Sequence, residues 1–110
     1  MPGHEMFQFK EWPFPEGTFP DDLGAVVQRT VLDGEEPARE VIHAADNSWI
    51  VGDGVNDPNR PGAVVATHIW HVIARDSSLL PLVDLPPGTE ARRSDPGEEW
   101  ARVPHAWLVD

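Results

Sequence analysis

The fold is decided by residues 39–51, which read REVIHAADNSWIV. Residues 39–44 alternate in character, so that one face of an extended chain carries Val41 and His43. The Asp-Asn-Ser sequence that follows is a turn signal, and residues 49–51 are rich in strand-forming side chains. The segment therefore predicts two strands joined by a tight turn.

A further strand is expected before this pair, over residues 25–32. Four of its residues are β-branched, a composition typical of strands: Val26, Val27, Thr30 and Val31. Asp33-Gly34 is a turn signal, and a hairpin is the natural connection from this strand to the strand at residues 39–44. The three strands together predict an antiparallel meander.

The chain after residue 51 predicts a loop, a strand and a helix. Residues 52–62 are rich in Gly, Asn, Asp and Pro, which favour turns, and residues 63–66 are expected to form a fourth strand. Thr67 is placed to cap a helix over residues 68–75. The apolar stripe of that helix is Ile69, Val72 and Ile73.

The last third of the chain completes the prediction of the fold. A short turn around residues 79–80 is expected to be capped by the acid or hydroxyl at residues 76–77. The Pro-Gly pair at residues 87–88 suits a type II turn, and strands are expected at residues 89–93 and 100–103. We therefore expect an α+β fold: a small antiparallel sheet of about five or six strands with one main helix packed on it.

Residues 1–20 form an aromatic, proline-rich leader ahead of a single α+β domain over residues 21–110. Alternation over residues 7–10 predicts a short strand, and the prolines exclude a continuous helix. Two interpretations stay open. The leader packs on the domain and completes its core, or it presents aromatic rings to a partner or a second copy. Those rings are Phe7, Phe9, Trp12, Phe14 and Phe19.

The charge balance limits the kinds of partner that the protein can bind. Its 110 residues include 19 Asp and Glu against 8 Lys and Arg, for a formal net charge of −11. Such a chain repels nucleic acid and anionic membranes and attracts basic partners. No signal peptide or membrane-length apolar run is visible, so we expect a cytoplasmic protein.

The residue types present do not indicate catalysis. The chain has no Cys and no Tyr, and its serines lie in turns and not in a nucleophile elbow. The paired glutamates at residues 35–36 and 98–99 would point to opposite faces of a strand, which makes them poor acid–base dyads. We expect no catalytic residue and no cofactor.

Two motifs have residue types that could bind a metal. The loop over residues 53–57 has oxygen ligands spaced as in a calcium loop, but lacks the terminal Glu of an EF-hand. His68 and His71 would share one face of the expected helix, where a metal needs a third or fourth ligand. A solvated turn and a polar helix surface are the simpler interpretations, so no metal is expected.

The five tryptophans divide into core and interface candidates. Trp49 and Trp100 lie on expected strands and are core candidates, and Trp70 is expected to be half-buried beside the apolar stripe of the helix. Trp12 and Trp107 lie near the ends of the chain. Because tryptophan is enriched at binding interfaces, these two are candidates for contact with a partner.

Residues 26–103 resemble a family of small bacterial domains first catalogued as being of unknown function. The family was later classed by genomic context as predicted immunity proteins of polymorphic toxin systems, akin to immunity protein family thirty-three. The most specific part is the Asp-Ser-Ser-Leu run at residues 76–79 with the Leu-Pro-Pro-Gly corner at residues 85–88. The other matching segments are residues 31–37, 41–43, 46–49, 52–54 and Trp100. The resemblance implies a toxin-neutralising role without catalytic residues.

The leading hypothesis is thus a non-enzymatic protein that covers the surface of a basic toxin. The expected contact residues are Glu35, Glu36, Glu40, Asp53 and Asp57 with the two terminal tryptophans. One alternative is a structural or regulatory domain that self-associates, as a homodimer, through its aromatic leader. A small-molecule or metal-dependent enzyme is the third hypothesis.

Overall fold

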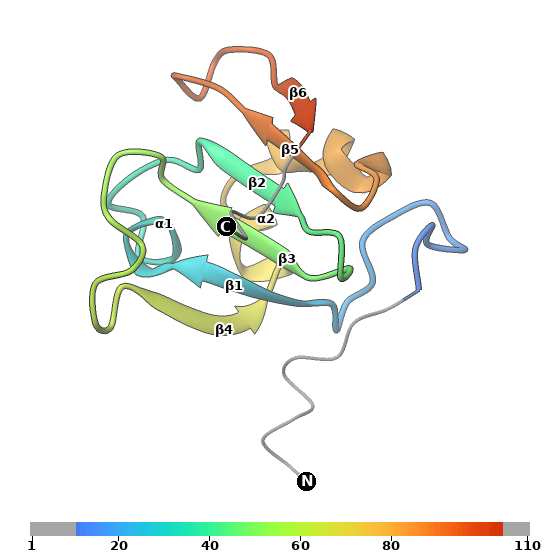
Figure 1. The fold of residues 1–110 in the computed structure, drawn as a ribbon, viewed down its shortest axis with the longest axis horizontal. Helices are drawn as coiled ribbons and strands as arrows, with labels where there is room; N and C mark the ends of the chain where they lie inside the picture. The colour runs from blue at the N-terminus through green and yellow to red at the C-terminus, as the bar shows by residue number, and fades with distance from the viewer. Residues whose placement is uncertain (1–10, 105–110) are drawn as a thin grey trace, which may run out of the picture.

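The computed structural model describes residues 11–104, which form a six-stranded sheet with short helices (Figure 1). The strands lie in the order β4-β1-β3-β2-β5-β6, and β1 and β3 are parallel while all other neighbours are antiparallel. The fold class is α+β. Along the chain the elements are β1 (Gly24–Gln28), α1 (Arg29–Leu32), β2 (Glu40–His43), β3 (Trp49–Gly52), β4 (Val64–His68), α2 (Trp70–Ile73), the 3-10 helix η2 (Ser77–Asp84), β5 (Thr89–Arg92) and β6 (Ala101–Pro104).

The hairpin expected from the opening segment is confirmed as β2 and β3. Ile42 pairs with Ile50 in an antiparallel register. The N–H of Ala44 donates to the carbonyl of Ser48 at 2.8 Å, which closes the turn. Asn47 adopts the left-handed φ of 75° that asparagine tolerates better than most residues.

The predicted antiparallel meander is wrong at its first strand. β1 ends at Gln28, and the chain then forms α1, although Thr30 and Val31 are β-branched. The carbonyl of Thr30 accepts from the N–H groups of Glu35 and Glu36 at 2.8 and 3.1 Å, and Val31 is buried in the core. Tertiary packing therefore overrides strand propensity here. β1 pairs with β3 in parallel and not with β2, so the sheet is mixed.

One face of the sheet is packed against α2 and η2, which lie behind the strands in Figure 1. The apolar stripe predicted for the helix is confirmed, because all of its residues are buried in this layer. The strands contribute Ala25, Val27, Val41, Trp49, Val51 and Ala91 to the core, and the helical segments contribute Ile69, Val72, Ile73, Leu79, Leu82 and Leu85.

The expected main helix is replaced by short helical segments. α2 covers only four residues. It begins at Trp70 because Thr67 pairs with Ala25 in the ladder between β1 and β4 and does not cap a helix. The carboxylate of Asp76 then accepts from the N–H of Ser78 at 3.1 Å and caps η2. The cap expected at residues 76–77 is thus confirmed, and it starts a new segment soon after α2 ends.

The described part of the leader, residues 11–20, packs on the core. Phe14 and Phe19 are 7% and 1% exposed. Their ring centroids lie 6.2 and 5.3 Å from that of Trp49. For this stretch the packing favours the interpretation in which the leader completes the core. The strand expected at residues 7–10 lies outside the described residues.

A buried arginine connects the run at residues 76–79 to the end of β5. The side chain of Arg93 is 1% exposed, and its guanidinium lies 4.0 Å from the ring centre of Trp100. Its donors reach the carbonyls of Ala38 and Pro96 at 3.0 and 2.9 Å, and the hydroxyl of Ser78 and the carboxylate of Asp76 at 2.8 Å each. A guanidinium suits this role because its donors are arranged in a rigid plane.

Candidate protein-binding surface

The face of the sheet opposite the helices carries a row of apolar side chains. Val26 pairs with Ile50, and Ile50 pairs with Ile42, so the three lie side by side on neighbouring strands. All three are half-buried, and no helix of residues 11–104 lies over them (Figure 1). We call this side of the sheet the open face. An apolar row that the helices leave uncovered is a candidate contact surface.

A groove of about 710 Å³ lies over the open face beside the loop that follows β3. The apolar row forms its floor, and its walls include Val55 and Val64, which are 62% and 38% exposed. In the described chain only Leu80 is a further exposed large hydrophobic residue, so the groove gathers most of this kind of surface. Its other lining residues are Gln28, Glu40, Val51, Gly52, Gly54, Asn56, Asp57, Pro58 and Asn59.

One wall of the groove is residues 53–59, the acidic loop, which is held by Asp53. The Asp53 carboxylate accepts from the N–H groups of Val55 and Asn56 at 2.9 and 2.8 Å, from the Asn56 amide at 2.7 Å and from the Thr30 hydroxyl at 2.6 Å. Burial raises the pKa of the Asp53 carboxyl, but hydrogen bonds from Asn56, Thr30 and Val55 outweigh it and lower the pKa to about 2. The loop is therefore built around a buried charge.

Gln28 anchors the same loop from the end of β1. Its side-chain oxygen accepts from the N–H of Asp53 at 2.8 Å, and its amide donates to the carbonyl of Asn56 at 3.1 Å. Farther along the loop, the carboxylate of Asp57 accepts from the N–H of Asn59 at 2.9 Å. The wall of the groove is thus fixed at its base and shaped by Asx turns.

The acidic residues predicted to contact a partner do not form one surface. Glu40 and Asp57 line the groove. Asp53 is 0% exposed and serves its own loop, so it offers a partner no surface. Glu35 and Glu36 line a separate hollow of about 580 Å³ next to α2. Only two of the five predicted carboxylates are therefore brought together with the apolar floor.

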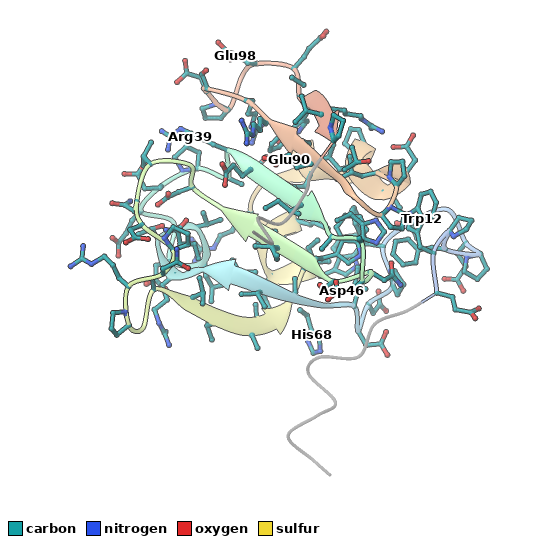
Figure 2. The ribbon with its side chains drawn as sticks, in the orientation of Figure 1. Trp12, Arg39, Asp46, His68, Glu90 and Glu98 are labelled. Carbon is teal, nitrogen blue, oxygen red and sulfur yellow. The ribbon has the colours of Figure 1, made fainter. Side chains whose placement is uncertain are left out.

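Trp12 lies away from the groove. Figure 2 places Trp12 and Arg39 toward opposite ends of β2. The acidic loop, which follows β3, lies at the same end of the sheet as Arg39. The Trp12 ring meets His43 edge to face with centroids 5.8 Å apart, and its N–H donates to the carbonyl of Val83 at 3.2 Å. Its polar atom is thus used within the fold. Trp107, the other predicted contact tryptophan, lies outside the described residues.

Two of the remaining three tryptophans lie as expected, whereas Trp100 precedes β6 and is not a core residue. Trp49 is confirmed as a core residue at 1% exposure. Trp70 is half-buried, as expected, and its N–H donates to the carbonyl of Phe19 at 2.8 Å. Trp100 is only half-buried, because one side of its ring covers Arg93 and does not enter the centre of the core.

His68 and His71 are brought together, with ring centroids 5.9 Å apart. His68 is the last residue of β4 and lies at the lower edge of the described part of the chain in Figure 2. Among residues 11–104, no group of three or more metal-ligating side chains converges there or anywhere else, the acidic loop included. The pair is thus a contact between two rings on the surface of the described chain.

Sequence reasoning assigned no role to several residues that organise the structure. The ring of His43 is fully buried, stacks on Trp49 with centroids 4.0 Å apart and donates from Nδ1 to the carbonyl of Leu85 at 2.6 Å. His43, Gln28 and Arg93 each have a hydrogen-bond partner that is distant in sequence, and no local pattern reveals those contacts. The single available signal was the position of His43 on the same face as Val41.

No helix of the described residues is long and apolar enough to cross a membrane. Comparisons of the chain with protein-family models, with curated proteins and with solved structures found no match. The structural case for a function therefore rests on the groove: an apolar floor, an acidic rim and a loop held in place by buried hydrogen bonds.

Proposed function

We propose that this chain is a cytoplasmic, non-enzymatic protein-binding domain that neutralises a basic toxin by covering part of its surface. The observation that carries the proposal is the groove on the open face, where exposed apolar side chains adjoin carboxylates. Burial of apolar surface is the dominant favourable contribution to most protein–protein association. The charges select the partner and speed its approach.

Charge supports a basic partner in particular. Among residues 11–104, the lining of the groove includes the carboxylates of Glu40 and Asp57 and no Lys, Arg or His. The whole chain has a formal net charge of −11, so its long-range electrostatic potential has the same negative sign as the groove. A basic protein would be attracted at a distance and matched at contact.

The toxin-neutralising part of the proposal rests on the resemblance of residues 26–103 to predicted immunity proteins. Its most specific runs build the scaffold: Asp76 binds Arg93, and Leu85 is buried in the core. The resemblance therefore supports a shared scaffold, on which the groove is the surface available for a partner of this chain.

Rescue of growth tests the proposal. The gene next to the one for this chain would be expressed in bacteria with and without this chain. We expect arrest of growth by the neighbour and relief by this chain. The two purified proteins should also form a complex whose association rate falls as NaCl rises. A neighbour that leaves growth unaffected, or a toxin that this chain does not bind, would disprove the proposal.

Self-association through the aromatic leader is the alternative function. Trp12, Phe14 and Phe19 would have to leave their own core to act in this way, because each packs against the domain. We therefore favour the groove over the leader as the contact surface.

A further inference from the structure

The groove also carries an inference about which group of the partner enters it, and this inference rests on the proposed function. We propose that the groove anchors one arginine or lysine side chain from an extended segment of the partner protein. The aliphatic stem of that side chain lies on the apolar row, and its cationic end meets the carboxylate of Glu40.

The position of Glu40 supports a cation site. Glu40 is the first residue of β2 and pairs with Gly52 on one side and with Arg92 on the other. A Cβ placed on Gly52 would lie 3.5 Å from Oε1 of Glu40 and 3.3 Å from Oε1 of Gln28. Two acceptor oxygens thus converge over a backbone position that has no side chain. The absence of a side chain at Gly52 leaves room there for a donor.

These oxygens retain acceptor capacity. Among the described residues, no hydrogen bond or ion pair to the Glu40 carboxylate is found. The Gln28 oxygen accepts one bond, from the N–H of Asp53, and a carbonyl oxygen can accept two. Arg92 lies opposite Glu40 and interacts with it electrostatically, but the hydrogen-bonded ion pair of its guanidinium is with Glu90. An incoming cation would therefore have no hydrogen bond or ion pair to displace at the Glu40 carboxylate.

The floor of the groove suits the stem of the same side chain. Ile42 follows Glu40 on the open face, and Val26 and Ile50 continue the apolar row across the sheet. Arginine and lysine bury their methylene groups on apolar surface while the charged end reaches a polar partner. A phosphate or an acidic side chain would be repelled by the carboxylates of Glu40 and Asp57, so the groove disfavours nucleic acid and acidic segments.

A pair of peptides tests this inference with the whole chain. The probe is the capped pentapeptide Leu-Ser-Arg-Ser-Leu, and its control has citrulline, which keeps the shape of arginine without the charge. Amide chemical shifts of the ¹⁵N-labelled protein would be followed during titration. The arginine peptide should shift residues of β2, β3 and the acidic loop and bind about tenfold more tightly than the citrulline peptide.

Matched variants identify the carboxylate involved. Glu40→Gln should weaken the binding of the arginine peptide about tenfold and leave the affinity for the citrulline peptide unchanged. Glu35→Gln makes the same change in net charge outside the groove and should change neither. Equal effects of the two variants would overturn the inference. Equal binding of the two peptides, shifts that map elsewhere, or no saturable binding up to about 10 mM would do the same.

The outcome separates this inference from the proposed function. If the chain binds the arginine peptide at Glu40 but fails to bind the toxin, the cation site is supported and the toxin-neutralising function is wrong. If Glu40→Gln neutralises the toxin as well as the wild type does, and the two peptides bind equally, the cation site is wrong while the function stands.

Discussion

Asp53, Arg93 and His43 are buried polar side chains that join segments distant in the sequence. Each is hydrogen-bonded, as a buried polar group must be if its burial is not to cost the fold stability. Among the described residues the exception is Trp49, whose buried N–H has no partner. The stacked contact with His43 covers the ring but does not replace that bond. Single substitutions at the bonded residues should therefore loosen whole segments.

Replacing Asp53 with Asn should lower the free energy of unfolding by about 2 kcal/mol at neutral pH, because a charged acceptor of several hydrogen bonds is lost. Asp57→Asn is the control, since Asp57 is exposed and its carboxylate accepts from the N–H of Asn59 within its own turn. Urea unfolding followed by tryptophan fluorescence measures both. Equal losses for the two variants would mean that burial of Asp53 does not matter.

The difference between wild type and Asp53→Asn should also depend on pH. The pKa of Asp53 is lowered from 3.8 to about 2 in the folded protein. A lowered carboxyl pKa stabilises the folded state fully above the unfolded value and loses that contribution as pH falls through the folded value. The advantage of the wild type should thus be constant above about pH 5 and shrink toward pH 2. A constant difference over this range would contradict the assignment.

Arg93→Met should cost about 3–5 kcal/mol, because it leaves the Asp76 carboxylate and two carbonyls without their buried donor. Arg102→Met provides the comparison. Arg102 pairs with Asp84 on the surface, where the two side chains are 38% and 71% exposed, and its loss should cost less than about 1 kcal/mol. Chemical denaturation would rank them, and a mild Arg93 variant would show that Trp100 and η2 are held by other contacts.

Among the secondary-structure elements, the pairing within the β2–β3 hairpin was predictable, and the pairing of β1 with β3 was not. β2, the turn and β3 follow from alternation and turn residues within one short segment. The parallel pairing of β1 with β3 depends on where α1 packs, which no local pattern contains. The same holds for the candidate site. Sequence analysis predicted Glu40 and Asp57 as contact residues, but not their apolar floor, because that floor comes from three strands whose order was unknown.

The acidic loop offers a test of how tightly it packs against the start of β2. Gly54 and Gly62 have similar left-handed φ angles of 74° and 76°, so replacement by Ala strains both by about 1 kcal/mol. At Gly54 the added Cβ would also lie 3.1 Å from Cβ of Arg39, whereas at Gly62 it meets nothing within 4 Å. Gly54→Ala should therefore destabilise the protein more in urea unfolding. Equal losses would show that the loop moves aside freely.

For the molecule as a whole, charge opposes the compactness that the core provides. The core is built from three parts of the chain. These are the leader, through Phe14 and Phe19, one face of the sheet, and the short helical segments. Folding brings carboxylates into a small volume, and a net charge of −11 makes their mutual repulsion unfavourable. Some of these charges form the acidic rim of the groove, so part of this cost belongs to the binding surface that we propose.

Screening that repulsion should stabilise the protein. At pH 7, raising NaCl from about 20 to about 300 mM shortens the range of the charges and should raise the thermal midpoint by about 4 °C, measured by calorimetry. Near the isoelectric point of about 4.6, where net charge vanishes, the same salt should raise the midpoint much less. Equal rises at both pH values would assign the effect to preferential exclusion of salt. In that case the acidic surface would carry no folding cost, and its carboxylates would be well enough dispersed to repel one another only weakly.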